Sequence, residues 1–414
     1  MPPVNALSTT CAGVGYSEKS NAREAGIEAA TAALAQAGTD ACDLVLLFAT
    51  AKQDPAAVRD GVRTIVGRRP RLVGGATVGV ITNDRLGYEG HQVGVAVVKS
   101  AGMRVDLFHE REICDREHDA GLNLGRQIRD AFPHVQPGAL LILYDIVKTE
   151  IGASLNLATP MLAGMTASLG EWPPTAGAAL MGDLQFSRGF QWIDEAIVAR
   201  SAAALALSGN IRMDTIQIHG CRPSGRYRTV TKAEGNMVLE IDGQPALDAV
   251  AQMLGPDTDR SNWEDYPIFI TFGINNGEKF GEYREDDYAV RLCSAVDKAR
   301  GGLAFFGDDL QPGREFQLMR RSNDPKHLES RVRELKARID GRRPILALYI
   351  DCAGRCSAMC GSEGEEATEI QKALGIGMPL LGWYVGGEIA SAGGVMQSHN
   401  WTGVLSILSE DAPA

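Results

Sequence analysis

Three cysteines at an even spacing stand out near the end of the chain. Residues 349–366 read "YIDCAGRCSAMCGSEGEE", with Cys352, Cys356 and Cys360 directly after an apolar run. Thiolates bind zinc and iron–sulfur clusters, but structural zinc sites use cysteine pairs two residues apart, and cluster motifs have other spacings. The alternative is that small buried residues pack a tight turn between a strand and a helix. If a metal binds here, the further ligands would be Glu363 or His399.

An arginine inside the same turn offers a different chemistry. The guanidinium of Arg355 could hold a ligand carboxylate or phosphate through two parallel N–H bonds. Its structural alternative is an ion pair, either with Glu388 or with the acidic helix expected after the turn. Glu388 follows two glycines and could itself accept a ligand amine.

A histidine and an amide follow shortly afterwards. His399 and Asn400 could hydrogen-bond a ligand, and the imidazole could act as a base or bind iron, although a single histidine is often structural. Trp383 and Tyr384 would line a ligand pocket or belong to the core. Cys352, His399 and Glu388 could also act together on a small metabolite, as thiol nucleophile, base and orienting acid.

The elements that must position these residues alternate between strands and helices. In the first third, "DLVLLFAT" (43–50) predicts a buried strand, and Asp54 with Pro55 opens a helix. The middle is richer in strands, and a polar stretch at 255–267 reads as a linker. We therefore predict an α/β fold of two related halves, with mixed, largely antiparallel sheets flanked by helices. The predicted domains are residues 1–255 and 256–414.

An internal repeat supports the two related halves. "VGRRPRLVGGATVGVI" (66–81) aligns without a gap with "LGIGMPLLGWYVGGEI" (374–389), at an offset of 382 − 74 = 308. The shared glycines permit a close backbone approach where a strand meets a loop, and a ligand often meets the backbone at such a junction. Polar and aromatic residues are concentrated in the second copy, so we place the pocket there.

Composition limits the class of protein. The 414 residues are 44% hydrophobic and 22% charged, and the net charge of −11 argues against a nucleic-acid partner. The N-terminus lacks the features of a signal peptide, and no apolar window is long enough to span a membrane. The eight cysteines suggest reduced thiols. We expect a cytoplasmic protein without a membrane partner.

At these motifs the sequence resembles the FIST proteins, which have an N-terminal and a C-terminal FIST module. The first module is marked by "VGGATVGVIT" and the strand "VGVAVV". The second is marked by the strand ending "DCAGR", by "LLGWYVGGEI" and by the step "HNWT" before the last strand. The resemblance covers nearly the whole chain. In two places the chain departs from the family pattern, since Val80 replaces an acid, and Cys356 and Cys360 are additional.

The resemblance implies a cytoplasmic sensory module that binds a small ligand, such as an amino acid or a small carboxylate, and passes its output to a separate signalling protein. The expected ligand-binding residues are Arg355, Glu388, His399, Asn400 and Tyr384. Two alternatives stay open. One is an enzyme that uses Cys352 and His399 on a small metabolite. The other is a haem- or metal-binding sensor of the nitric-oxide type, with Cys352, Cys356 and Cys360 as candidate metal ligands.

Overall fold

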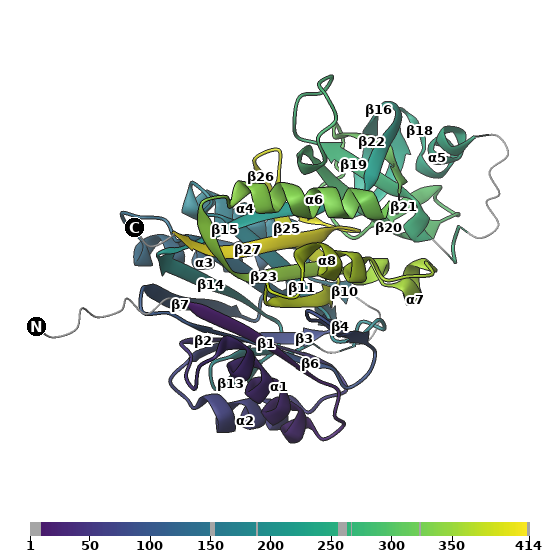
Figure 1. The fold of residues 1–414 in the computed structure, drawn as a ribbon. Coiled ribbons are helices and arrows are strands. Elements are labelled where there is room, and N and C mark those ends of the chain that lie inside the picture. Colours follow the sequence, from purple (N-terminus) through teal and green to yellow (C-terminus); the bar gives the residue numbers. More distant parts are fainter. Residues whose placement is uncertain are drawn as a thin grey trace, which may run out of the picture.

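The computed structural model describes residues 10–149, 154–187, 189–255, 263–265, 267–322 and 324–411. It is a mixed α/β structure of three six-stranded sheets and a small β-barrel (Figure 1). The predicted α/β class, with mixed sheets flanked by helices, is confirmed. Within the described residues, no helix is long and apolar enough to cross a membrane.

The first sheet is built mainly from the N-terminal part of the chain, and two helices cover its outer face. Its central strands β2 and β3 are parallel and joined through α2, which begins at the predicted N-cap Asp54 and ends before Gly67. The strand order is β1 (Cys11–Ser17), β6 (Val93–Lys99), β2 (Leu44–Thr50), β3 (Arg71–Thr77), β12 (Gln191–Ile193) and β13 (Ala196–Val198), with α1 (Ala22–Ala37) and α2 (Pro55–Val66) outside.

The second and third sheets have the same plan. The second runs β7 (Met103–Arg111), β14 (Ser201–Gly209), β8 (Ala139–Asp145), β11 (Thr175–Leu180), β25 (Gly387–Ala392) and β26 (Val395–His399), with α3 (Glu117–Ala131) and α4 (Ala158–Leu169) outside. The third runs β15 (Ile211–Ile218), β27 (Gly403–Asp411), β23 (Arg342–Cys352), β24 (Leu380–Val385), β4 (Gly79–Ile81) and β5 (Leu86–Tyr88), with α6 (Pro325–Arg338) and α8 (Glu366–Leu374) outside.

The three sheets reveal three copies of one unit, where the sequence indicated two. Each copy runs strand, helix, strand, helix and then four strands, and in each sheet four strands come from one copy. The fourth and fifth strands of each copy leave their own sheet and complete the sheet of another copy. The hairpin β4–β5 joins the third sheet, β12–β13 joins the first, and β25–β26 joins the second. This exchange is cyclic, so the three copies are related by an approximate threefold axis.

Close backbone contacts fix the equivalence of the copies. Gly74, Gly177 and Gly382 lie opposite Leu47, Ile142 and Tyr349 on the parallel neighbouring strand. A Cβ at Gly177 or Gly382 would stand 2.7 Å from the carbonyl oxygen of its partner, and one at Gly74 would stand closer still. The inner faces of all three sheets pack together, with Phe48, Leu143 and Ile350 buried at equivalent positions in one shared core.

A closed barrel interrupts the third copy between β15 and α6. Its strands are β16 (Cys221–Glu234), β22 (Glu315–Arg321), β19 (Thr271–Asn275), β20 (Tyr288–Asp297), β21 (Gly302–Phe305) and β17 (Met237–Ile241), which pairs back with β16. The short β18 (Gln244–Pro245), α5 (Ala246–Leu254) and the single turns η1 (Pro267–Phe269) and η2 (Glu285–Asp287) accompany it. The barrel takes strands from both sides of the predicted boundary at 255/256. Residues 256–262, within the predicted linker, lie outside the described residues.

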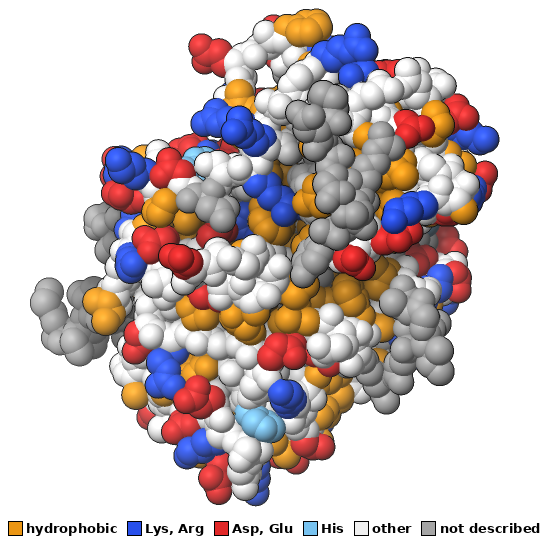
Figure 2. Space-filling view, turned by 90° about the vertical axis from the view of Figure 1, so that its right-hand side faces the viewer, with side chains coloured by type: hydrophobic (Ala, Val, Ile, Leu, Met, Phe, Trp, Pro, Cys, Tyr) orange, Lys and Arg blue, Asp and Glu red, His pale blue; other side chains and the backbone are white. Residues whose placement is uncertain are grey.

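The remaining elements are short and lie at the carboxyl ends of the central strands. They are the hairpin β9 (Val147–Thr149) and β10 (Ser154–Leu155), and the turns η3 (Ala353–Arg355) and α7 (Ser357–Cys360) after β23. Figure 2 shows the right-hand side of the molecule in Figure 1, where basic and acidic side chains are interspersed around a central apolar area.

The equivalence of the glycines can be tested by substitution. We expect Gly382→Ala to lower the free energy of unfolding by about 1–3 kcal/mol, because the added methyl group would overpack the space beside Tyr349. Gly377→Ala is the matched control, since a Cβ there meets nothing within 4 Å. Denaturant unfolding measures both variants, and equal stabilities would contradict the assigned contact.

Candidate functional site

The cysteine-rich turn begins at the last residue of β23. Cys352 and Cys356 are buried, and Cys360 is partly exposed, with its Sγ 3.3 Å from the carbonyl oxygen of Arg355. All eight cysteines are free thiols. In the described part of the chain, no three His, Cys, Asp or Glu side chains are grouped so that they could hold a metal ion. Burial of Cys352 and Cys356 and the hydrogen bond of Cys360 contribute to holding this turn.

Arg355 is the centre of this turn, and its donors are engaged by the protein itself. Its side chain is only 2% exposed. The guanidinium pairs with Asp351 at 3.1 Å and with Glu366, the first residue of α8. Its Nη1 donates to the carbonyl oxygens of Trp401 (3.1 Å) and His219 (3.4 Å). Of the two roles predicted for Arg355, this geometry is that of the ion pair with the acidic helix.

Two carboxyl groups near Arg355 have raised pKa values because they are buried. Burial raises the pKa of Asp351 to about 7, against the attraction of Arg355. Burial also raises the pKa of Glu388 well above its ordinary value, and the charge of Asp351 adds to the effect. Glu388 is fully buried; its Oε2 accepts from the Thr402 N–H at 3.3 Å, and its Oε1 has no partner. A buried oxygen without a partner is costly and marks a position where a donor would stabilise the fold.

The other predicted residues are engaged within the protein, His399 and Asn400 by the backbone and Tyr384 by a carboxyl side chain. His399 is opposite Glu388 in the β25–β26 pair, and its Nε2 is 3.1 Å from the carbonyl oxygen of Ala390. Burial lowers the pKa of His399 to about 3, so the ring is neutral. Asn400 donates to the His399 carbonyl oxygen and accepts from the Leu292 N–H of the barrel. The Tyr384 hydroxyl donates to Glu365 at 3.2 Å.

This arrangement does not favour thiol catalysis. Burial raises the pKa of Cys352 well above its ordinary value, with the charge of Glu388 as the next cause, so the thiol keeps its proton at neutral pH. The carboxyl group of Glu388 is a neighbour of this thiol. A nucleophilic cysteine needs a base that lowers its pKa, and the neighbouring carboxyl group does the opposite.

Trp401 is a residue that the sequence did not indicate. It has φ = 53°, a left-handed conformation that is unusual for a bulky side chain, and the Arg321 guanidinium lies 3.6 Å from its ring centroid. Its carbonyl oxygen, turned by this conformation, is the one that accepts from Arg355. Strained residues of this kind cluster at functional sites. Only the step "HNWT" marked the position in the sequence.

The first and third copies hold different residues at the position of Arg355. Six residues beyond Leu47 and Tyr349, the equivalent positions are Gln53 and Arg355. The Gln53 Nε2 donates to the carbonyl oxygens of Lys19 (2.9 Å) and His91 (2.6 Å), the residues that follow β1 and precede β6. Arg355 donates to the residues that follow β15 and precede β27. The same backbone clamp is thus made by a neutral amide in the first copy and a guanidinium in the third.

The second copy places an acid at the equivalent of Cys352. Asp145 ends β8, and its Oδ2 accepts from the Ser201 N–H at 3.1 Å. The Ser201 hydroxyl donates to the same oxygen at 3.5 Å, and the Gln191 Nε2 donates to the carbonyl oxygen of Ser201. Burial raises the pKa of Asp145 to about 7, and its Oδ1 has no partner. Sequence reasoning missed Asp145 because the second copy was not recognised.

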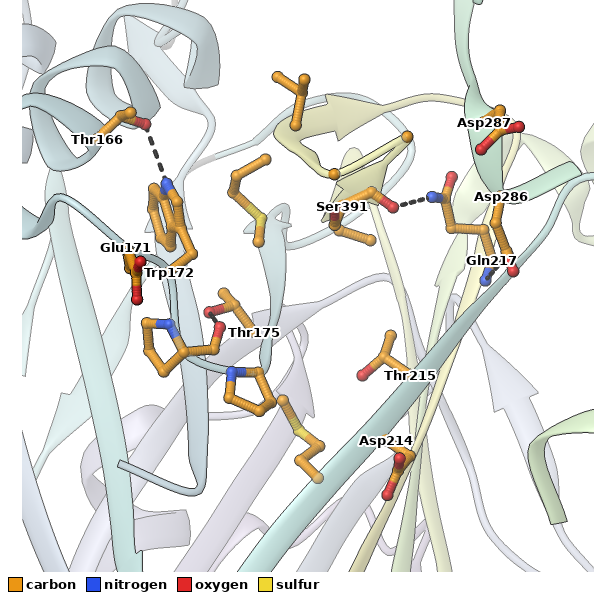
Figure 3. A pocket seen from close by; sticks show the side chains of 18 of the residues that line it. Thr166, Glu171, Trp172, Thr175, Asp214, Thr215, Gln217, Asp286, Asp287 and Ser391 are labelled. Atoms are coloured by element: carbon orange, nitrogen blue, oxygen red, sulfur yellow. Dashed lines mark hydrogen bonds between the residues drawn. The ribbon is translucent and has the colours of Figure 1, made fainter. Parts of the chain in front are cut away.

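An open cavity of about 1030 Å³ lies on the other side of the β25–β26 hairpin (Figure 3). Glu171, Trp172 and Thr175 form one wall, after α4, and residues of β15 form the opposite wall. The Gln217 side chain donates to the carbonyl oxygen of Ser391, which closes the cavity towards the hairpin. The other lining residues are Thr166, Gly170, Pro173, Pro174, Met213, Asp214, Thr215, Arg284, Asp286, Asp287, Arg338, Ala390, Gly393, Gly394, Val395 and Met396.

The charged residues of this cavity differ in whether they are paired. Asp286 pairs with Arg331 and, at 2.8 Å, with Arg338. Asp214 pairs with Arg342 at 2.6 Å. Arg284 and Asp287 are different. Within the described residues, each forms an ion pair only with the other, at 3.9 Å. No sequence motif indicated this pair, which lies in the barrel insertion.

The fold and the site define a three-copy α/β protein with an inserted barrel and an open polar cavity. The chain belongs to the FIST family, as the resemblance predicted. The FIST N domain matches residues 43–244, and the FIST C domain matches residues 246–391.

The relatives that match this chain are uncharacterized proteins. One from Mycobacterium bovis and one from Mycobacterium tuberculosis are each 26% identical over 416 residues, which cover 96% of this chain and 99% of theirs. One from Methanocaldococcus jannaschii is 26% identical over 197 residues, 44% of this chain and 36% of its own. Among solved structures, a cyanuric acid hydrolase from A. caulinodans has a TM-score of 0.24 at 11% identity, covering 48% of this chain and 72% of that chain.

The ion pairs of Arg355 can be tested against the first copy. Arg355→Gln keeps a donor for the backbone clamp but leaves Asp351 and Glu366 buried without their cation. We expect a loss of about 3–5 kcal/mol in the free energy of unfolding. The triple variant with Asp351→Ala and Glu366→Gln removes those charges and imitates Ala49 and Gln53. It should recover most of the loss, and a triple variant as unstable as the single one would contradict the equivalence.

The buried acid of the second copy predicts a pH dependence. The folded-state pKa of Asp145 is raised from 3.8 to about 7, so its contribution to stability is fully present below pH 3.8 and is lost as the pH rises through about 7. Asp145→Asn should therefore flatten the stability curve between pH 4 and 7. At pH 8 we expect it to stabilise the protein by up to roughly 4 kcal/mol, less the cost of altered hydrogen bonds. Denaturant unfolding across this pH range measures both effects.

Proposed function

We propose that this FIST protein is a sensory protein that binds a small amino acid in the cavity between β15 and the β25–β26 hairpin. The observation that carries this proposal is the charge pair on the cavity wall. The Arg284 side chain is 74% exposed and that of Asp287 is 20% exposed, with 3.9 Å between Nε and Oδ2. A pair at that distance, with one exposed and one partly buried member, is weakly held, so both groups are available to a ligand.

The pair matches the two charges of an amino acid. A guanidinium presents N–H donors in a planar fork that suits a carboxylate, and an aspartate accepts from an ammonium group. The neighbouring acids Asp214 and Asp286 are already bound to arginines of the protein. In this proposal Arg284 binds the ligand carboxylate, which is the role that the sequence suggested for Arg355. The apolar lining, which includes Trp172, Val395 and Met396, would receive the ligand side chain.

A ligand here would be connected to the buried turn through one residue. Glu285 lies between Arg284 and Asp287 along η2, and its carboxylate accepts from the His219 N–H (2.7 Å) and the Gly220 N–H (2.8 Å). Burial opposes this charge, but His219, His327 and Arg331 hold the pKa of Glu285 well below its ordinary value. His219 in turn accepts from Arg355. A ligand that displaced η2 would therefore move the Arg355 turn.

The predicted ligand residues Glu388, His399, Asn400, Tyr384 and Arg355 form a buried layer behind the cavity in this proposal. The strands of Glu388 and His399 also carry Ser391 and Met396, which line the cavity. We propose that this layer responds to the ligand, with the output read by a separate signalling protein in the cytoplasm.

Calorimetry with the twenty amino acids, and with matched amines and deaminated acids, tests the proposal. Arg284→Gln and Asp287→Asn should each lower the affinity for the amino acid that binds by about tenfold or more. The reason is that a charge-assisted hydrogen bond contributes about 1.5–3 kcal/mol. Arg333→Gln is the matched control, because Arg333 is exposed on α6 and pairs only with Glu329 among the described residues. Binding unchanged in both variants, or no binding by the whole panel, would contradict the proposal.

A further inference from the structure

A second cavity, of about 600 Å³, lies between the first and second copies, at the carboxyl end of β2. The turn after β2 forms one side, and the loop after β11 forms the other. The backbone N–H of Ala51 donates to the carbonyl oxygen of Gly182, which joins the two sides. The lining residues are Thr50, Ala51, Lys52, Gln53, Pro55, Glu89, Gly182, Asp183, Gln185, Ser187, Phe190, Ile197, Val198 and Ala199.

Gln53 lines this cavity and carries an acceptor that has no hydrogen-bond partner. Its side-chain nitrogen donates to two carbonyl oxygens, those of Lys19 and His91. A carbonyl oxygen accepts only, so these two bonds identify the donating atom as Nε2 and the other amide atom as Oε1. Gln53 is 3% exposed, and its Oε1 has no hydrogen-bond partner. A buried amide oxygen in this position needs a donor.

The equivalent position in the third copy shows what kind of donor the fold accommodates. There Arg355 makes the same two backbone hydrogen bonds and carries a cationic group with additional N–H donors, which are directed to Asp351 and Glu366. The first copy has the clamp without the cation. A cation supplied from outside would therefore occupy a position that the protein fills with its own guanidinium in the third copy.

The walls of the cavity carry acceptors and apolar surface. Glu89 and Asp183 are the acids among the described lining residues, and the single cation, Lys52, already donates its ammonium group to the Glu89 carbonyl oxygen. Phe190, Ile197 and Val198 supply apolar area.

Two further acceptors lie behind this wall. The Oε1 of Gln191 and the Oδ1 of Asp145 are buried and have no partner. Gln191 directly follows the lining residue Phe190, and the Asp145 Oδ1 would stand 3.5 Å from a Cβ at Gly189. Unpartnered acceptors thus lie close to the cavity as well as in its lining.

We propose that this cavity binds an organic cation, a primary ammonium or amidinium group carried by a small apolar body. The cationic group would donate to the Gln53 Oε1 and to the carboxylate of Asp183 or Glu89, and the apolar body would lie against Phe190 and Val198. The site is separate from the amino-acid cavity of the proposed function and does not depend on it.

Calorimetry with phenethylammonium and benzamidinium tests this proposal, with 2-phenylethanol as the neutral and 3-phenylpropionate as the anionic counterpart. We expect the cations to bind and the counterparts not to. The Asp183 Oδ1 accepts from the Gln185 and Ser187 N–H groups at 3.0 Å, and Asp183→Asn keeps an acceptor for both. This variant should lower the affinity for the cations about five- to tenfold. Ala199→Phe fills the cavity and should abolish binding. Thermal unfolding confirms that both variants are folded.

Two controls separate this site from others. Asp130→Asn removes an exposed charge on α3 that pairs with Arg129, and it should leave the affinity unchanged. Arg284→Gln should also leave it unchanged, because that residue belongs to the other cavity. Equal binding of 2-phenylethanol, preference for 3-phenylpropionate, full binding by Ala199→Phe, or no binding of either cation would each overturn the proposal.

Discussion

The exchange of strand hairpins among three copies of one unit is the constraint on which the rest of this structure depends. Each copy donates two strands and receives two, so every sheet is completed by main-chain hydrogen bonds from another copy. Unpaired strand edges are costly to leave exposed, and the cyclic exchange covers one edge of each central strand pair. It also brings the inner faces of all sheets together, which produces the shared core around Phe48, Leu143 and Ile350.

The sequence was sufficient for the class of fold and for two of the three copies. Buried strands read as apolar runs, helix starts were marked by Asp54 and Pro55, and the glycines around Gly74 and Gly382 aligned. The second copy escaped because Phe190 and Gln191 stand where the others have Gly79-Val80 and Gly387-Glu388, so the shared glycine is lost. The barrel also separates the first strand of the third copy from its helix, and no local pattern reveals such an insertion.

The candidate site shows a different limit of sequence reasoning. The types and spacing of Arg355, Cys352 and Glu388 led us to expect a ligand pocket at this strand end. They could not show that Arg355 is held by carbonyl oxygens of His219 and Trp401, which are distant in sequence. Whether a guanidinium is free for a ligand depends on the backbone that surrounds it. The less conspicuous Arg284 and Gln53 carry polar groups that are weakly paired in one case and unpartnered in the other.

The cyclic exchange means that the two family domains are not independent parts of the molecule. The N-terminal module would hold β4 and β5 with no third sheet to receive them, and the second sheet would end at β11 without β25. Neither half can reach its final structure before the other has been synthesised. Loss of the second module would leave β4 without β24 and β11 without β25, so an edge would open in a sheet of each remaining copy. A change in one module is therefore felt in the sheets of the other.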